Sequence, residues 1–221
     1  MLGISSPASL VIADVAENAR PEWFGTAYGP VAKSAHCLGT RKRALEAIVQ
    51  LAVELAREGR EGRKIGTLFV IGDVENVLAR SRPLLLDPLH GHPADILRAE
   101  LPDFRETVKE LAQLDGAFIV DDDGTFVSAG RFIDVDLTPT NFLPGLGTRH
   151  AAAASVTRET GATAVAVSQS SVVRVFSHGE IRAEIIPELF LMSRDGLFTR
   201  EAEVSQLPEL GVTLAVAGEA G

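Results

Sequence analysis

Three short polar clusters carry the residue types that could do chemistry, and each lies at a boundary between predicted elements. In the first, Asp115 is followed by Gly116 and Ala117, which leaves a carboxylate beside backbone that a flat ligand can approach closely. Asp-Gly is also a common turn dipeptide. This cluster alone is therefore consistent with either a ligand site or an ordinary turn.

The second cluster is a Gly-Thr-Arg-His sequence that begins at Gly147 and leads into four alanines. The unpaired N–H groups and the dipole at a helix start favour an anion. Thr148 could cap the helix and donate to a phosphate, Arg149 offers a bidentate guanidinium, and His150 could bind a phosphate oxygen or a metal. The alternative is a capped helix with solvated cations.

The third cluster is a Ser-Gln-Ser-Ser sequence that begins with Ser168 and Gln169, between two predicted strands. Polar residues at a strand end either line a ligand cleft or simply form a turn. A carboxylate, an Arg–His pair at a helix start and a polar strand end together suit phosphoryl or nucleotidyl transfer. Neither the G-x-S-x-G sequence of serine hydrolases nor a P-loop occurs in the chain.

Composition restricts the partners and the location. The 221 residues include 21 Lys and Arg against 30 Asp and Glu, a formal net charge of −9, and no basic stripe. This argues against a nucleic-acid partner. No apolar run reaches the roughly 18 residues of a membrane-spanning helix, so no membrane association is expected. The N-terminus lacks a basic start, and Cys37 is the single cysteine, so a cytoplasmic location is predicted.

Periodicity and turn residues predict the elements that must position these clusters. Asp73 should cap a short helix, and Asp103 with Glu106 should form a capping box. The aliphatic composition, 46% hydrophobic but 5% aromatic, and the order of elements predict an α/β fold: a mixed central β-sheet flanked by helices on both faces. The predicted elements are a helix at 41–58, a strand at 65–73, helices at 74–81 and 103–114, a hairpin at 115–135, a helix at 148–160, and strands at 162–169, 171–177 and 180–187.

Four sequences together resemble a known family. "IGTLFVIGDVENVL", "LDGAFIV", "LGTRHAAAAS" and "AVAVSQSSVVRVFSHGEI" are similar, in order and spacing, to the diadenylate cyclase domain, and most of all to archaeal-type stand-alone cyclases. The family signatures are Asp-Gly-Ala and Gly-Thr/Ala-Arg-His-Arg-Ala-Ala. The resemblance covers residues 42–186, which leaves 1–41 as an N-terminal extension and 187–221 as a C-terminal extension expected to pack on the domain.

The resemblance implies a nucleotidyltransferase that condenses two ATP molecules into cyclic di-AMP with release of two pyrophosphates. It further implies Mg²⁺ or Mn²⁺ as cofactor, and a homo-oligomer in which two protomers face each other, each presenting one ATP. Asp115 would bind the metal and help to activate the attacking ribose 3′-hydroxyl. Gly116 and Ala117 would contact the nucleotide through their backbone.

The same resemblance assigns the phosphates to the helix start. Thr148, Arg149 and His150, preceded by Gly147, would hold them, with His150 also near the metal. Ser168 matches a strand-end serine that approaches the phosphates, and Gln169 is its neighbour.

Ala151 departs from the family pattern, which has a second arginine directly after the histidine. The loss of one charge-assisted contact costs about 1.5–3 kcal/mol, which is about ten- to a hundredfold in rate. Arg174 could compensate. Alternatively, the protein could bind ATP or cyclic di-AMP and cyclise weakly or not at all. Because Asp115, Arg149 and His150 are retained, we predict an active enzyme.

Overall fold

The computed structural model describes residues 39–134 and 147–185, together with two further strands, β8 (Ala202–Leu207) and β9 (Val212–Ala217). The two further strands pair with each other in an antiparallel two-stranded sheet. Residues 1–38 and most of 187–221 lie outside the described residues. The two predicted extensions, and the packing of the second on the domain, therefore stay predictions.

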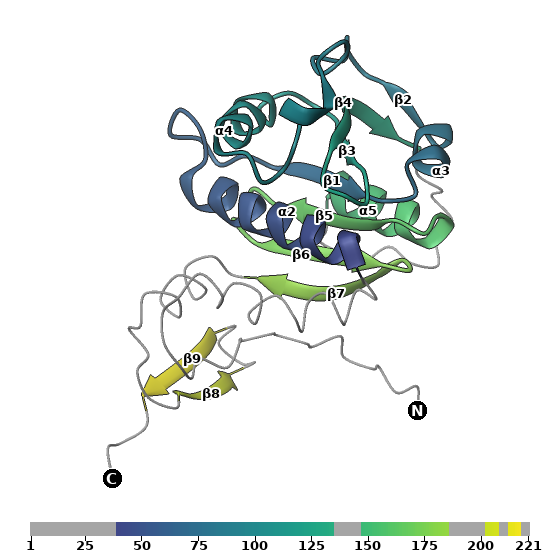
Figure 1. Ribbon diagram of the computed structural model, residues 1–221. Helices are drawn as coiled ribbons and strands as arrows, with labels where there is room; N and C mark the ends of the chain where they lie inside the picture. Colours follow the sequence, from purple (N-terminus) through teal and green to yellow (C-terminus); the bar gives the residue numbers. More distant parts are fainter. Residues whose placement is uncertain (1–38, 135–146, 186–201, 208–211, 218–221) are drawn as a thin grey trace.

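A seven-stranded mixed sheet forms the centre of the fold, in the order β2-β4-β3-β1-β5-β6-β7 (Figure 1). Strands β1 and β3 are parallel. The other neighbouring pairs are antiparallel. The strands are β1 (Thr67–Ile71), β2 (Ser81–Pro83), β3 (Ala117–Val120), β4 (Phe126–Ile133), β5 (Thr163–Val167), β6 (Val173–Ser177) and β7 (Glu180–Ile185).

Helices cover both faces of this sheet, as predicted. Successive residues of a strand point to opposite faces, so Phe69 and Ile71 of β1 pack with α2 (Gly39–Glu58) and α4 (Pro102–Leu111). Leu68 and Val70 of the same strand pack with α3 (Val74–Ala79) and α5 (Thr148–Glu159). All residues of β1 are buried, which explains why the four residues after Thr67 are all apolar rather than alternating with polar ones.

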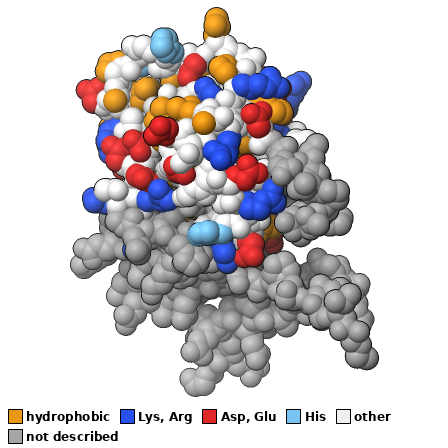
Figure 2. Space-filling model, turned by 90° about the vertical axis from the view of Figure 1, so that its right-hand side faces the viewer, with side chains coloured by type: hydrophobic (Ala, Val, Ile, Leu, Met, Phe, Trp, Pro, Cys, Tyr) orange, Lys and Arg blue, Asp and Glu red, His pale blue; other side chains and the backbone are white. Residues whose placement is uncertain are grey.

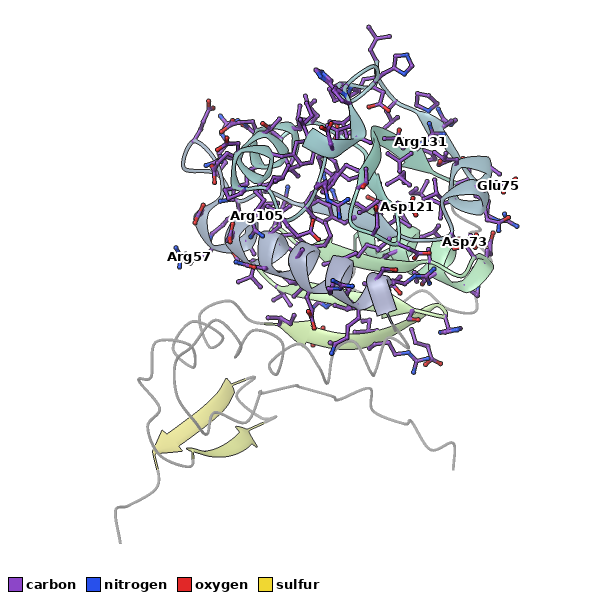
Figure 3. The ribbon with its side chains drawn as sticks, viewed as in Figure 1. Arg57, Asp73, Glu75, Arg105, Asp121 and Arg131 are labelled. Carbon is purple, nitrogen blue, oxygen red and sulfur yellow. The ribbon has the colours of Figure 1, made fainter. Side chains whose placement is uncertain are left out.

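Strand β2 was not predicted, because the sequence at 82–95 indicates a loop. Three residues are too few to show periodicity. The strand pairs with β4 and is held there by Arg131 (Figure 3), whose Nε donates to Ser81 Oγ at 2.8 Å and whose Nη2 donates to Ser81 O at 2.9 Å. The short strand is thus fixed by a side chain from about 50 residues away.

Two predicted helix caps are wrong in detail. Helix α4 begins at Pro102, with Leu101 as its N-cap residue. Proline is favoured at the first helical position, because the N–H that it lacks would have no partner within the helix there. Asp103 therefore lies inside the first turn. Glu106 does not close a capping box. It instead accepts hydrogen bonds from Arg60 and Lys109.

Asp73 occupies the N-cap position of α3 but makes no side-chain cap bond, since its backbone is left-handed with φ 47°. Its carboxylate accepts from the Gly161 N–H and from Asn76 Nδ2, each at 2.7 Å. The side chain, labelled in Figure 3, therefore ties the turn after β1 to the turn after α5 instead of capping.

Lys109 links α4 to α2 through a buried ammonium group. The residue is 5% exposed, and Nζ lies 3.0 Å from Glu54, 3.4 Å from Glu58 and 2.8 Å from Glu106. Breaking such a network is costly because the remaining partners lose their counter-charge. The three carboxylates are partly exposed, so water offsets part of that cost.

Lys109→Met should lower the free energy of unfolding by about 2 kcal/mol, as measured by urea denaturation. Lys42→Met is the matched control, since the Lys42 side chain is 43% exposed and, within the described residues, forms a single i,i+4 pair, with Glu46 at 3.8 Å. The control should cost less than about 0.5 kcal/mol. Equal losses in both variants would contradict a structural role for the buried network.

Candidate active site

One edge of the central sheet brings the three polar clusters together. Thr67 at the start of β1 pairs with Val167 at the end of β5, and Leu68 pairs with Ala117 at the start of β3. Asp115, just before β3, and Ser168, just after β5, therefore lie at the same sheet edge. The start of α5 reaches this edge through Arg149.

Arg149 joins the first two clusters. Its Nη2 lies 3.6 Å from Asp115 Oδ1, although the two residues are 34 positions apart in the sequence. The guanidinium also lies against Gly66, where a Cβ atom would be 2.9 Å from Arg149 Nη1. Gly66 thus lies in the candidate site, and it was not among the residues predicted from the sequence. The only signal for it was a glycine directly before a buried strand.

Asp115 presents its carboxylate to solvent, with 87% of the side chain exposed. The following Gly116 has φ 110°, and a Cβ atom there would lie 2.5 Å from the carbonyl carbon of Gly130 on β4. This close approach of two strands requires glycine. Gly116 is therefore explained by the sheet itself, while the exposed carboxylate of Asp115 is left accessible to a ligand.

His150 is buried under the start of α5, with 7% exposure. Its Nε2 lies 3.1 Å from Nη1 of Arg174 on β6, and its ring centroid is 6.1 Å from that of Phe176. Burial, followed by the charges of Arg174 and Arg149, lowers the pKa of His150 to about 4, against an opposing effect of Glu184. The imidazole is neutral at pH 7.

The buried histidine predicts a loss of stability in mild acid. The unfolded chain takes up this proton near pH 6.5, whereas the folded protein does so only near a pKa of about 4. The unfolded state therefore binds more protons between these values. The stability contribution is complete above about pH 6.5 and is lost as the pH falls toward 4, by on the order of 3 kcal/mol in total.

Urea denaturation of the wild type and of His150→Gln at pH 7 and pH 5 measures this effect. The wild type should lose about 2 kcal/mol more than the variant between the two pH values. Parallel losses in the two proteins would show that His150 does not carry the effect.

The remaining predicted site residues lie at the same sheet edge but form local contacts. Gly147, not Thr148, is the N-cap residue of α5, and Thr148 is the exposed first residue of the helix. Ser168 Oγ donates to Val172 O at 3.1 Å and accepts from the Val172 N–H at 3.2 Å. Within the described ranges, the hydroxyl of Ser168 bonds only inside its own turn, and the neighbouring Gln169 is exposed.

The donor set suits a metal that arrives with phosphates rather than a dedicated metal cage. In the part of the chain that the structure describes, no three His, Cys, Asp or Glu side chains are grouped to hold a metal. Mg²⁺ is commonly held by one or two carboxylates together with substrate phosphates. Asp115 fits that arrangement. The Nε2 of His150 is already next to a guanidinium.

The charged side chains of the described surface include both signs, as the composition does (Figure 2). Basic and acidic side chains are intermingled on the face drawn in Figure 2. None of the described helices combines the length and apolarity needed to cross a membrane.

Several known proteins are similar in sequence to the part of the chain that contains the candidate site. The family described as DisA bacterial checkpoint controller nucleotide-binding, or DAC, matches residues 54–181. A curated diadenylate cyclase of Methanocaldococcus jannaschii is 47% identical over 156 residues, 70% of this chain and 49% of that protein. A curated diadenylate cyclase of Haloferax volcanii is 37% identical over 147 residues, 65% of this chain and 52% of that protein. The chain thus spans about half the length of these relatives.

Two solved structures are more distant. A crystal structure of a hypothetical membrane spanning protein from Bacillus cereus is 22% identical, with a TM-score of 0.47 over 62% of this chain and 61% of that one. A double mutant of DacA from Staphylococcus aureus is 20% identical, with a TM-score of 0.44 over 69% of this chain and 94% of that one.

Proposed function

Because the chain belongs to the DAC family, we propose that it is a diadenylate cyclase, which condenses two ATP molecules into cyclic di-AMP and releases two pyrophosphates. The single observation that carries this proposal is the contact between Asp115 and Arg149. It places an exposed carboxylate 3.6 Å from a guanidinium at the start of a helix. A carboxylate to activate a hydroxyl and a cation to hold phosphates are the two requirements of nucleotidyl transfer.

Asp115 has the first role in this proposal. Its carboxylate would accept the proton of the ribose 3′-hydroxyl as that oxygen attacks the α-phosphorus of the second ATP and pyrophosphate leaves. The same carboxylate would hold the divalent cation. The metal, Mn²⁺ or Mg²⁺, neutralises charge on the triphosphate when bound. Gly116 and Ala117, which directly follow Asp115 in the sequence, contact the nucleotide through their backbone.

The start of α5 has the second role. Its free backbone N–H groups and its dipole attract the triphosphate, Arg149 binds phosphate oxygens with its planar fork, and Thr148 donates through its hydroxyl. His150, as a neutral side chain, helps to hold the phosphates. Ser168 and Gln169 line the neighbouring strand end. The metal and Arg149 provide local positive charge, so a net charge of −9 does not prevent ATP binding.

Two protomers face each other in the proposed active assembly, each with one ATP. A cyclic product requires that two 3′-hydroxyls attack two α-phosphates. The open position of Asp115 allows the nucleotide of a second protomer to approach. A cytoplasmic location, where ATP is supplied, completes the proposal.

Ala151 favours the one alternative, a protein that binds ATP or cyclic di-AMP without efficient turnover. Pyrophosphate release from ATP in the presence of Mn²⁺ or Mg²⁺ separates the two functions. The cyclase should release one pyrophosphate per ATP consumed, with neither ADP nor inorganic phosphate. Saturable ATP binding without pyrophosphate release would support the proposal of a nucleotide-binding protein and contradict that of a cyclase.

A further inference from the structure

Arg174 of β6 is a charged residue next to His150 that the proposed mechanism does not use. The register of the sheet places it directly opposite Ala166 of β5 and Glu184 of β7. Paired residues lie on the same face of a sheet, so Arg174 stands on the face that α5 covers, with Phe176 two positions along. Its side chain is 15% exposed.

The guanidinium of Arg174 contacts a carboxylate through one nitrogen and an imidazole through another. Its Nε forms an ion pair with Glu184, and its Nη1 lies 3.1 Å from His150 Nε2. Glu184 balances the positive charge. Whether Arg174 also replaces the phosphate-binding arginine that is absent at Ala151 stays a prediction.

An arginine can only donate hydrogen bonds, and this fixes the chemistry of the imidazole. The Nε2 of His150 must present its lone pair, so the ring hydrogen is on Nδ1. We propose, on the basis of the proposed function, that Arg174 is a positioning residue: anchored by Glu184, it donates to Nε2 of His150 and thereby commits this side chain to phosphate binding through Nδ1–H.

The same contact opposes metal binding by His150 at either nitrogen. A metal on Nε2 would compete with the guanidinium for one lone pair. A metal on Nδ1 would move the ring hydrogen to Nε2, where it would point at an N–H group of Arg174. Of the two residues predicted to hold the metal, Asp115 is therefore the one that remains as a metal ligand in this proposal.

Nitrogen-15 NMR of the histidine side chains of the full chain tests the proposal without any need for activity. The protein has five histidines, and the signal missing from His150→Gln identifies His150. The wild type should show the Nδ1–H tautomer at pH 7. Arg174→Met should lose this preference, and Arg174→Lys, which keeps a donor, should retain most of it. Arg158→Met, on the solvent side of α5, is the matched control and should leave the tautomer unchanged.

Turnover gives a second readout. In Arg174→Met, kcat for cyclic di-AMP formation should fall about ten- to a hundredfold, with the KM for ATP changed less than about threefold. Arg174→Lys should recover most of the rate. If Arg174→Met does not fold, Glu184→Gln tests the same anchor and should weaken the tautomer preference.

The outcomes separate this proposal from the proposed function. An inactive wild type that still shows the Arg174-dependent tautomer would overturn the cyclase but not the positioning role. An Nε2–H tautomer in the wild type, or an unchanged tautomer in Arg174→Met, would overturn the positioning role.

Discussion

Asp115→Asn should reduce cyclic di-AMP formation by about a thousandfold or more, while the protein stays folded. Asparagine keeps the size of the side chain but removes the charge that holds the cation and the base that accepts the hydroxyl proton. Loss of several kcal/mol of transition-state stabilisation corresponds to this decrease in rate. The side chain is 87% exposed, so its replacement should change the unfolding midpoint little. Product formation, measured by liquid chromatography, and urea denaturation provide the two readouts.

Asp103→Asn is the matched control, because Asp103 is an exposed carboxylate on α4 that lies outside the proposed site. Its activity should equal that of the wild type. Activity within about tenfold of the wild type in Asp115→Asn would show that Asp115 is not the metal-binding carboxylate.

Arg149→Ala should have the second-largest effect. A charge-assisted hydrogen bond to phosphate contributes about 1.5–3 kcal/mol, so kcat/KM should fall by about ten- to a hundredfold for each such bond that the alanine variant cannot form. No second arginine follows at Ala151, so the decrease should lie at the upper end of this range. Arg149→Lys should be intermediate, because lysine keeps the charge but lacks the planar fork.

Arg158→Ala on the same helix is the control for this variant, since Arg158 pairs only loosely with Glu159 at 3.7 Å. It should leave kcat/KM within about twofold of the wild type. If Arg149→Ala and Arg158→Ala were equally active, the start of α5 would not be the phosphate-binding element.

Local patterns in the sequence were sufficient to predict most of the fold. The helix at 41–58 has apolar residues at helical spacing, and the strand at 65–73 is a short apolar run between glycines; both are present as α2 and β1. The Asp/Gly turn at 121–124 correctly indicated the β3–β4 hairpin. Strand β2 was missed because its pairing depends on β4, which follows it by more than 40 residues.

The sequence was sufficient to propose the residues of the candidate site, but not the contacts between them. Asp115, Arg149 and His150 stood out by residue type and by their positions at element boundaries. Gly66 could not be found in the same way, since its importance lies in the space that it leaves for Arg149. Likewise, the pairing of Arg174 with Glu184 and His150 depends on the register of β6 and β7 and on how α5 packs over them.

The most direct test of the central claim is to identify the product by mass spectrometry after incubation of the purified protein with ATP and Mn²⁺. We predict cyclic di-AMP from the wild type and none above background from Asp115→Asn. A wild-type protein that binds ATP under these conditions yet returns it unchanged would contradict the account.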